Sequence, residues 1–343
     1  MKTGDSNTIV TANASDLASL IGRHGRAIVL TDDNVDRCCR PLFEALVGDK
    51  NTVVSITVGE ESKSLDTVVY IWSRLMENCA DRNTLLVNLG GGVVSDLGGF
   101  AASCYNRGIA FVNVPTTLLA MVDASLGGKT GFDFMGVKNK IGLFSNPEMV
   151  YVNTGFLDTL PRRQLLSGLA EMVKCGFVAD RRLLGVNTLN YKDFIDIAMN
   201  IKQAIVTADR YDTGRRMVLN FGHTIGHALE SVSIDFGQNM LHGEAVAMGM
   251  FCGLYLSHKR HRMPVSLLDD YVATMLSLLG ECDVALTDDM LANVRQKLIH
   301  DKKTHRARPV FVLLDERMEC VLDDGVSEAD VTEALGNLQK LLP

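Results

Sequence analysis

The 343-residue chain has no apolar run long enough to cross a membrane as a helix. Its longest run, residues 245–256, has twelve residues, whereas a membrane-spanning helix needs about 20. We therefore expect residues 245–256 to form a helix buried in a protein core. The N-terminal stretch 1–17 is polar and lacks the apolar segment of a secretory signal peptide, so the sequence favours a cytoplasmic protein.

The chain also lacks an excess of positive charge and a disulfide framework. Its 34 Lys and Arg residues are outnumbered by 41 Asp and Glu residues, which gives a net charge of −7. This balance argues against a general nucleic-acid or anionic-membrane binder, but it allows a local basic pocket for an acidic substrate. Among the eight cysteines only Cys38 and Cys39 are close together, and no CxxC pair occurs, so we expect reduced thiols.

Strand-like and helix-like patterns alternate in the first half of the chain. The periodicity predicts helices at 64–80 and 93–105, a strand that runs into a loop within 26–35, and strands at 51–58, 84–92 and 109–117. Such alternation is typical of a parallel sheet with helices on both faces.

The pattern changes after Pro161, where the periodicity is mostly helical up to Glu281 and only one late strand is predicted, at 308–314. A chain of this length is also too long for one typical core. We predict an α/β domain at 1–157 and a mostly helical domain at 158–343. In a two-domain enzyme the cleft between the domains is the default ligand site.

Three glycines, Gly90, Gly91 and Gly92, close the strand predicted at 84–92. A phosphate can approach a backbone without Cβ atoms, and the N-terminus of the following helix favours its charge. The pattern is not GxGxxG, and a tight turn is the alternative. Asp32 and Glu60 follow two other predicted strands, where carboxylates commonly hold ribose hydroxyls, although solvated loop charges are as compatible with their positions.

A polar cluster follows at 115–142, where five glycines are mixed with charged, amide and hydroxyl side chains. Lysines and an asparagine beside glycines suit a phosphorylated or carboxylated substrate, and Arg107 adds another cation. A surface loop is the alternative. The polar members of the cluster are Thr116, Thr117, Asp123, Lys129, Lys138 and Asn139.

Four residues in the second half are candidate metal ligands: Glu171, His223, His227 and His242. His223 and His227 are four apart, so on a helix both imidazoles project from one face. Nitrogen and oxygen ligands suit Zn²⁺, and a catalytic zinc site keeps three protein ligands and an open position. Spacing alone leaves open which three of the four would bind.

Six stretches together resemble the 3-dehydroquinate synthase family: LGGGVVSDLGGF, VPTTLLAMVDASLGGKT, GVKNKIG, GLAEMVKCG, LNFGHTIGHALE and LHGEAVAMGM. They occur in the family's order, and the resemblance covers roughly residues 26–315. It implies a Rossmann-like NAD-binding domain followed by a helical domain that binds metal and substrate. It also implies a lyase of the shikimate pathway, usually homodimeric, that uses catalytic NAD and a divalent metal, Zn²⁺ or Co²⁺.

The implied reaction converts 3-deoxy-D-arabino-heptulosonate 7-phosphate into 3-dehydroquinate and phosphate. Its steps are transient oxidation by NAD, phosphate elimination, reduction, ring opening and intramolecular aldol closure. The metal would act as a Lewis acid on two vicinal hydroxyls, and the cofactor would carry the hydride.

The resemblance also implies roles for individual residues. The implied metal ligands are Glu171, His223 and His242. The implied catalytic residues are His227, Lys129, Lys174 and Asn220. Residues implied to bind NAD are Asp32, Asn34, Glu60, Lys63, Gly91, Gly92, Val93, Asp96, Thr116, Thr117, Asp123, Lys129 and Lys138. Residues implied to bind substrate are Arg107, Asp123, Lys138, Asn139, Lys202, Arg216, Lys302 and Lys303. Arg107 is expected to reach the active site of a partner subunit.

Three other functions compete with this one. Another sugar-phosphate cyclase, such as a 2-deoxy-scyllo-inosose synthase, would share fold, NAD and metal but act on a phosphate without a carboxylate. A glycerol-dehydrogenase-like oxidoreductase would need no phosphate-binding lysines. A pseudoenzyme would not require the complete set of candidate site residues. The sequence also departs from the family's pattern at Arg210 and Asp212, and the segment 183–192 is short.

Overall fold

The structure, a computed structural model, describes residues 8–49, 51–135, 137–305 and 309–342, without the side chains of 299–305. The chain divides into two compact units, Met1–Pro161 and Arg162–Pro343. The first holds a parallel sheet and the second is mainly helical, as the fold class predicted from the sequence requires.

The first unit is built on a six-stranded parallel sheet with the strand order β1-β8-β5-β4-β2-β3. Its strands are β1 (Ile9–Thr11), β2 (Arg26–Asp32), β3 (Thr52–Ile56), β4 (Thr84–Gly90), β5 (Ala110–Pro115) and β8 (Met149–Tyr151). Its helices are α1 (Ala14–Arg23), α2 (Asp33–Cys38), α3 (Arg40–Val47), α4 (Leu65–Glu77) and α5 (Gly92–Cys104). The four strands and two helices predicted in this half are confirmed.

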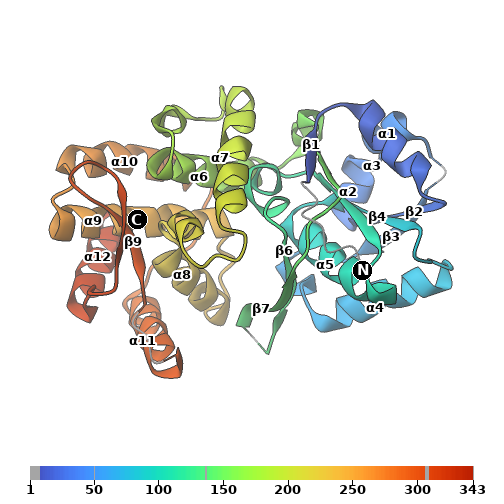
Figure 1. Ribbon diagram of the computed structural model, residues 1–343. Helices are drawn as coiled ribbons and strands as arrows, with labels where there is room; N and C mark the ends of the chain where they lie inside the picture. The colour runs from blue at the N-terminus through green and yellow to red at the C-terminus, as the bar shows by residue number, and fades with distance from the viewer. Residues whose placement is uncertain (1–7, 50, 136, 306–308, 343) are drawn as a thin grey trace. The chain divides into compact units, whose positions relative to one another are not determined.

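Both faces of the central strands are buried, which explains their continuous apolar sequences. On one face, Ile28 and Leu30 of β2 belong to a core cluster with Val68 of α4 and Leu97 of α5. Figure 1 draws α4 and α5 on this side of the sheet and α1 and α3 on the other. Ser64 begins α4 where it does because its hydroxyl accepts a hydrogen bond from the backbone N–H of Thr67.

The chain order reverses at the centre of this sheet. Strand β3 lies on one side of β2, and β4, which follows β3 in the chain, lies on the other. In open parallel sheets, ligands bind outside the carboxyl ends of the strands at such a reversal. The ends of β2 and β4, at Asp32 and Gly90, are therefore the position in this unit where the topology favours a ligand.

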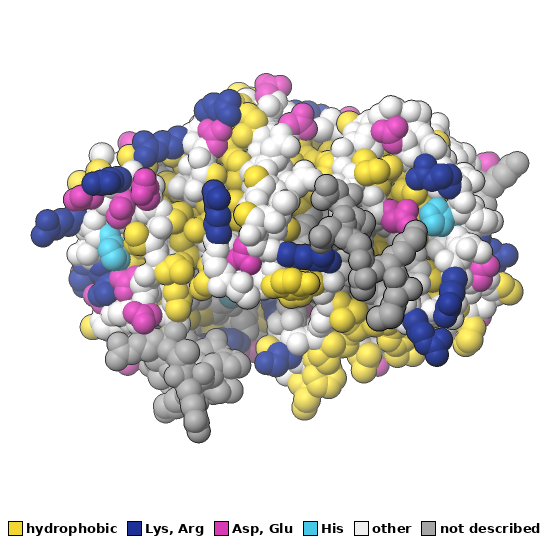
Figure 2. All heavy atoms as spheres, in the orientation of Figure 1, with side chains coloured by type: hydrophobic (Ala, Val, Ile, Leu, Met, Phe, Trp, Pro, Cys, Tyr) yellow, Lys and Arg dark blue, Asp and Glu magenta, His cyan; other side chains and the backbone are white. Residues whose placement is uncertain are grey.

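An antiparallel hairpin of β6 (Lys129–Phe134) and β7 (Val137–Phe144) follows β5. It lies within the polar cluster at 115–142, for which the sequence predicted no strand. Within the described residues β7 pairs only with β6, and it carries exposed apolar side chains that include Val137, Ile141 and Leu143. Figure 2 shows hydrophobic side chains gathered low in the view, where Figure 1 draws this hairpin.

The second unit contains seven α-helices and one two-stranded ribbon among its described residues. The helices are α6 (Arg162–Val178), α7 (Ile195–Ala208), α8 (His223–Asp235), α9 (His242–His261), α10 (Val265–Leu278), α11 (Asp288–His305) and α12 (Glu328–Leu341). The ribbon pairs β9 (Phe311–Leu314), which confirms the late strand predicted at 308–314, with β10 (Cys320–Asp323), which was not predicted.

Helix α9 forms the core of this unit, as predicted for residues 245–256, because nearly all of its residues from Gly243 to Ser257 are buried. Its sequence is apolar around its whole circumference, and α6, α8, α10 and α12 all pack against it. No described helix combines the length and hydropathy that spanning a lipid bilayer requires.

Helices α8 and α9 approach each other at backbone distance. A Cβ atom at Gly249 of α9 would lie 1.9 Å from the carbonyl oxygen of Gly222, and one at Gly226 of α8 would lie 2.9 Å from that of Ala245. Glycine is therefore required on both sides of this contact. The contact decides how the side chains at the start of α8 and α9 meet.

We predict that Gly249→Ala lowers the free energy of unfolding by about 1–3 kcal/mol, because the new methyl group can fit only if the two backbones separate. Gly336→Ala in α12 is the matched control, since a Cβ atom there meets nothing within 4 Å. The control should stabilise the protein by about 0.5–1 kcal/mol. Urea unfolding of both variants provides the measurement, and a Gly249→Ala variant as stable as the wild type would contradict the close approach.

Candidate active site

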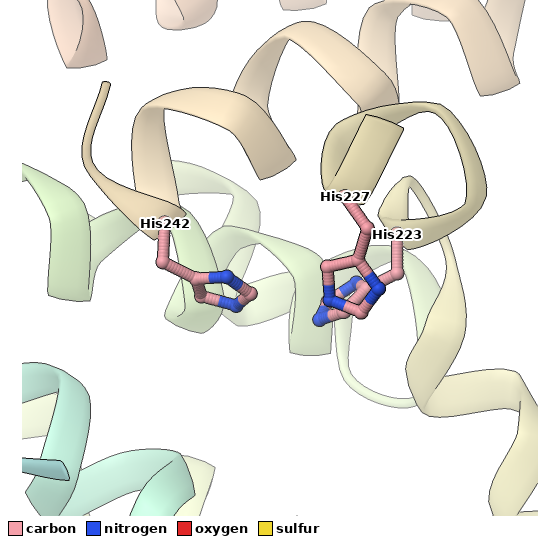
Figure 3. A group of neighbouring side chains, drawn as sticks. All are labelled: His223, His227 and His242. Atoms are coloured by element: carbon pink, nitrogen blue, oxygen red, sulfur yellow. The ribbon is translucent and has the colours of Figure 1, made fainter. Parts of the chain in front are cut away.

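Three histidines meet where α8 and α9 begin. Gly222 adopts the left-handed φ of +78°, which favours glycine, and α8 starts at the next residue, His223. His227 lies one turn further on the same face, and His242 is the first residue of α9. Figure 3 shows the three imidazoles converging, and one ring nitrogen from each lies within 4.8 Å of the others.

Glu171 of α6 reaches the same place. Its buried carboxylate oxygen Oε1 lies 3.5 Å from Nε2 of His223 and 3.5 Å from Nε2 of His242. These separations are longer than ordinary hydrogen bonds. They match the spacing of about 3.4 Å between neighbouring ligand atoms of one tetrahedral Zn²⁺. The arrangement of these three donors therefore fits a divalent cation such as Zn²⁺ or Co²⁺.

The other ring nitrogens of two histidines face acceptors on the protein. Nδ1 of His223 lies 3.2 Å from the carbonyl oxygen of Phe221, and Nδ1 of His242 lies 3.3 Å from Oε2 of Glu230. A histidine that donates Nδ1–H to such an acceptor keeps the lone pair of Nε2 for a metal. Both rings thus turn Nε2 toward Glu171.

The charges of this cluster follow from burial and close neighbours. Burial opposes ionisation of Glu171, but the ammonium group of Lys174, one turn along α6, holds the pKa of that carboxyl well below its usual range. Burial and Lys174 hold the pKa of His223 well below its usual value, so this ring is neutral. Burial also disfavours charge on His242, yet Glu171 and Glu230 raise its pKa to about 10. A metal that binds this imidazole must therefore displace a proton from it.

The other site residues predicted in this unit lie on α7 and on the 3₁₀ segment Arg215–Asn220. Lys202 of α7 and Arg216 are buried cations, and Asn220 is half-buried. Arg216 donates a hydrogen bond to the carbonyl oxygen of Arg210. The side chains of Lys302 and Lys303, predicted to bind substrate, lie outside the described part of the chain.

In the first unit, a polar network joins several residues predicted to bind NAD. Nζ of the buried Lys63 lies 2.5 Å from Oδ2 of Asp96 and 2.6 Å from Oδ1 of Asn139. Nζ of Lys138 lies 3.5 Å from Oε1 of Glu60. The structure therefore brings together side chains from three segments of this unit that are distant in sequence.

Asp32 stands at the carboxyl end of β2, and it serves as a helix cap. Its Oδ1 accepts hydrogen bonds from the backbone N–H groups of Asn34 and Val35, each at 3.0 Å, and so begins α2. A ribose hydroxyl that bound here would therefore hydrogen-bond to the same carboxylate that caps the first turn of α2.

The glycine-rich turn after β4 leads directly into α5. Gly91 is the N-cap of α5 and supplies no capping side chain, so the N–H groups of the first turn, including that of Val93, receive no hydrogen bond from a cap residue. A Cβ atom at Gly91 would lie 3.2 Å from the methyl group of Thr117, and one at Gly92 would lie 3.2 Å from Ala124. Uncapped N–H groups at a helix N-terminus form an anion-binding position.

Three further predicted residues lie close to this turn or to the hairpin. The backbone N–H of the buried Thr116 donates to the carbonyl oxygen of Gly90 at 3.0 Å. Asp123 lies in a single π-helical turn, Ala120–Ala124, a form that often occurs at functional sites. Lys129 begins β6 and is exposed.

Arg107 lies apart from these residues, in the connection between α5 and β5, where it is exposed and has a left-handed φ of +67°. Glu230 is the polar residue at the histidine cluster that the sequence did not single out. Its position seven residues after His223, on the same face of a helix, is the pattern that would have found it.

Comparison with known proteins assigns both halves of the chain to one family. A family model described as 3-dehydroquinate synthase N-terminal matches residues 53–167, and one described as 3-dehydroquinate synthase C-terminal matches residues 168–304. The 3-dehydroquinate synthase of Parabacteroides distasonis is 36% identical over 323 residues, which cover 91% of this chain and 91% of the relative.

Two solved structures share the fold. The 2-epi-5-epi-valiolone synthase of Streptomyces hygroscopicus subsp. jinggangensis, with NAD⁺ and Zn²⁺ bound, has a TM-score of 0.81 at 24% identity and covers 99% of this chain and 98% of its own. A 2-deoxy-scyllo-inosose synthase, complexed with carbaglucose-6-phosphate, NAD⁺ and Co²⁺, has a TM-score of 0.79 at 24% identity, with coverage of 97% and 96%. These likenesses establish the architecture.

We predict that Lys63→Met lowers the free energy of unfolding by about 3 kcal/mol, because it leaves the carboxylate of Asp96 without its buried cation. Adding Asp96→Asn should restore part of this loss, since the double variant no longer holds an unpaired charge. Lys138→Met is the control and should cost less than about 1 kcal/mol, because its partner Glu60 is solvent-exposed. Urea unfolding without nucleotide measures all three, and equal losses for the two lysines would contradict the buried pair.

Proposed function

The chain belongs to the 3-dehydroquinate synthase family, and from this premise we propose that it converts 3-deoxy-D-arabino-heptulosonate 7-phosphate into 3-dehydroquinate and phosphate. Among the competing functions, this one is supported best by the match to the family over most of the chain. The convergence of Glu171, His223 and His242 on one point supports a reaction that depends on a metal. Phosphate elimination makes this reaction that of a carbon–oxygen lyase.

Glu171, His223 and His242 would hold the divalent metal. Support comes from the equal 3.5 Å separations, from the neutral ring of His223 and from acceptors that turn Nε2 of both histidines toward the carboxylate. The two solved structures named above contain Zn²⁺ or Co²⁺, the ions that this donor set suits. When bound, the metal supplies Lewis acidity to the hydroxyls of the substrate.

The first unit would hold NAD at the carboxyl ends of β2 and β4. The uncapped first turn of α5 would bind the pyrophosphate, while Asp32 and the network around Lys63 would hold the adenosine end. When bound, NAD supplies the transient acceptor for a hydride. Remaining residues of the predicted set that would contact it are Asn34, Glu60, Gly91, Gly92, Val93, Asp96, Thr116, Thr117, Asp123, Lys129 and Lys138.

The remaining charged side chains would orient the substrate. It carries a phosphate and a carboxylate, so a net-acidic protein must concentrate cations at the site, and buried Lys202 and Arg216 supply two of them. His227, beside the histidine ligands, would exchange a proton with the substrate or contact the leaving phosphate. Lys174 would keep Glu171 ionised. The other proposed contacts are Lys129, Lys138, Asn139, Asn220, Lys302 and Lys303.

We also propose that two chains form a homodimer in which Arg107 of one subunit reaches the active site of the other. Its exposure and its place in a turn after α5 support this role.

All eight cysteines are free thiols, which suits the reducing environment of a cytoplasmic enzyme.

The direct test incubates the purified protein with the heptulosonate phosphate, a catalytic amount of NAD⁺ and Zn²⁺. We expect phosphate release, 3-dehydroquinate as the product, and no net accumulation of NADH. A parallel reaction with a sugar phosphate that lacks a carboxylate should release no phosphate. Turnover of that control alone would identify a different sugar-phosphate cyclase, and NADH in proportion to substrate would identify a dehydrogenase.

We predict different losses for the two histidines of α8. His223→Ala should lose bound metal, because it removes one of three ligands, and activity should fall with it. His227→Ala should retain metal but lose turnover by about 10²-fold or more, the usual contribution of a proton-transfer group. Metal content by atomic emission and steady-state kinetics measure the two effects. Equal loss of metal from both variants would show that His227 is also a ligand.

A further inference from the structure

Glu230 closes the LNFGHTIGHALE stretch, and among the described side chains it is a carboxylate at the histidine cluster that the proposed function does not use. It lies on the same face of α8 as His223 and His227, one turn beyond His227. Its Oε2 lies 3.3 Å from Nδ1 of His242, which belongs to α9. Glu230 therefore spans the two helices on the side of the imidazole that faces away from Glu171.

The burial of Glu230 calls for a specific partner. Its side chain is 7% exposed, whereas that of His242 is 27% exposed. A carboxylate removed from water is costly unless it is paired or hydrogen-bonded, and the His242 ring is a paired group on α9. The glycine contacts between α8 and α9 hold the helices close enough for this pair to form.

We propose that Glu230 is the positioning residue of His242: it accepts the Nδ1–H and thereby directs Nε2 toward Glu171, where a metal can take the place of the Nε2 proton. This inference rests on the metal site of the proposed function. The carbonyl oxygen of Phe221 does the same for His223, at 3.2 Å. The two rings thus differ in kind, since one faces a neutral acceptor and the other a carboxylate, which makes a ligand histidine more basic.

The test measures metal binding directly on the metal-free full chain. Co²⁺ is titrated into wild type, Glu230→Ala and Glu230→Gln, and its visible absorption reports both affinity and ligand geometry. We expect Glu230→Ala to bind Co²⁺ about 10–100-fold more weakly, with a changed spectrum. Glu230→Gln keeps an acceptor oxygen of similar shape, and it should recover the wild-type spectrum and part of the affinity.

A matched control separates positioning from general destabilisation. His261 and Asp323 form another histidine–carboxylate pair in the same unit, with Nε2 and Oδ2 2.8 Å apart. Asp323 is 8% exposed, similar to Glu230, and its side chain pairs with Arg260 and His261, which are not members of the histidine cluster. Asp323→Asn should therefore bind Co²⁺ with wild-type affinity and spectrum, even if it lowers the melting temperature.

Several outcomes would overturn the proposal, and they can be told apart. Wild-type affinity and spectrum in Glu230→Ala would refute the positioning role and leave the metal site intact. If Asp323→Asn weakened Co²⁺ binding as much as Glu230→Ala does, the weakening would be explained by a general loss of stability and not by positioning of His242. Absence of Co²⁺ binding by the wild type would refute the metal site itself, and the role of Glu230 with it.

Discussion

The backbone contact between α8 and α9 is the constraint on which the candidate metal site depends. Gly222, Gly226 and Gly249 lie where any side chain would meet the facing backbone. Because these positions carry no Cβ atom, the start of α9 comes close to the functional face of α8. The consequence is chemical, since His242 of one helix meets His223 and Glu230 of the other. The three glycines thus determine where the side chains of the histidine cluster lie.

The parallel sheet of the first unit was predictable because its strands are buried on both faces. Burial makes β2 and β4 continuous apolar runs, and the helices between strands keep their own period. The hairpin β6–β7 was not predictable in this way. Its eight-residue strand β7 is exposed almost throughout, so no alternation of buried and exposed positions marks it, and glycines and lysines made it resemble a loop.

The site was predictable only in part. Spacing on one helix put His223 and His227 together, and the structure confirms that they share a face of α8. Glu171 and His242 come from other helices. Their residue types made them candidate ligands, but only the family resemblance assigned them to one site with His223, because distance along the chain says nothing about such contacts. Glu230 was missed although helical spacing places it on the same face as His223. A glutamate seven residues from a histidine is ordinary on any solvated helix, so the spacing alone did not mark it. The division of roles among these residues stays a prediction.

Fold and chemistry are separable in this molecule. The two solved structures that share its architecture carry other names, at 24% identity, so the fold admits more than one reaction. What distinguishes one function from another is the set of cations and amides that meet the substrate. Two residues that we propose for this set, Lys202 and Arg216, are buried in the helical unit, where each must be kept in place by the residues around it.

The edge of β7 that pairs with no other strand among the described residues has a consequence for how variants of Lys138 can be studied. A strand with an unpaired edge and exposed apolar side chains is a template for aggregation, and lysines on the strand are the usual protection. In β7 the charged residues are Lys138 and Lys140. Lys138 would therefore serve both substrate recognition and solubility. A variant at this position that loses activity must be shown by light scattering to be monodisperse before the loss is ascribed to catalysis.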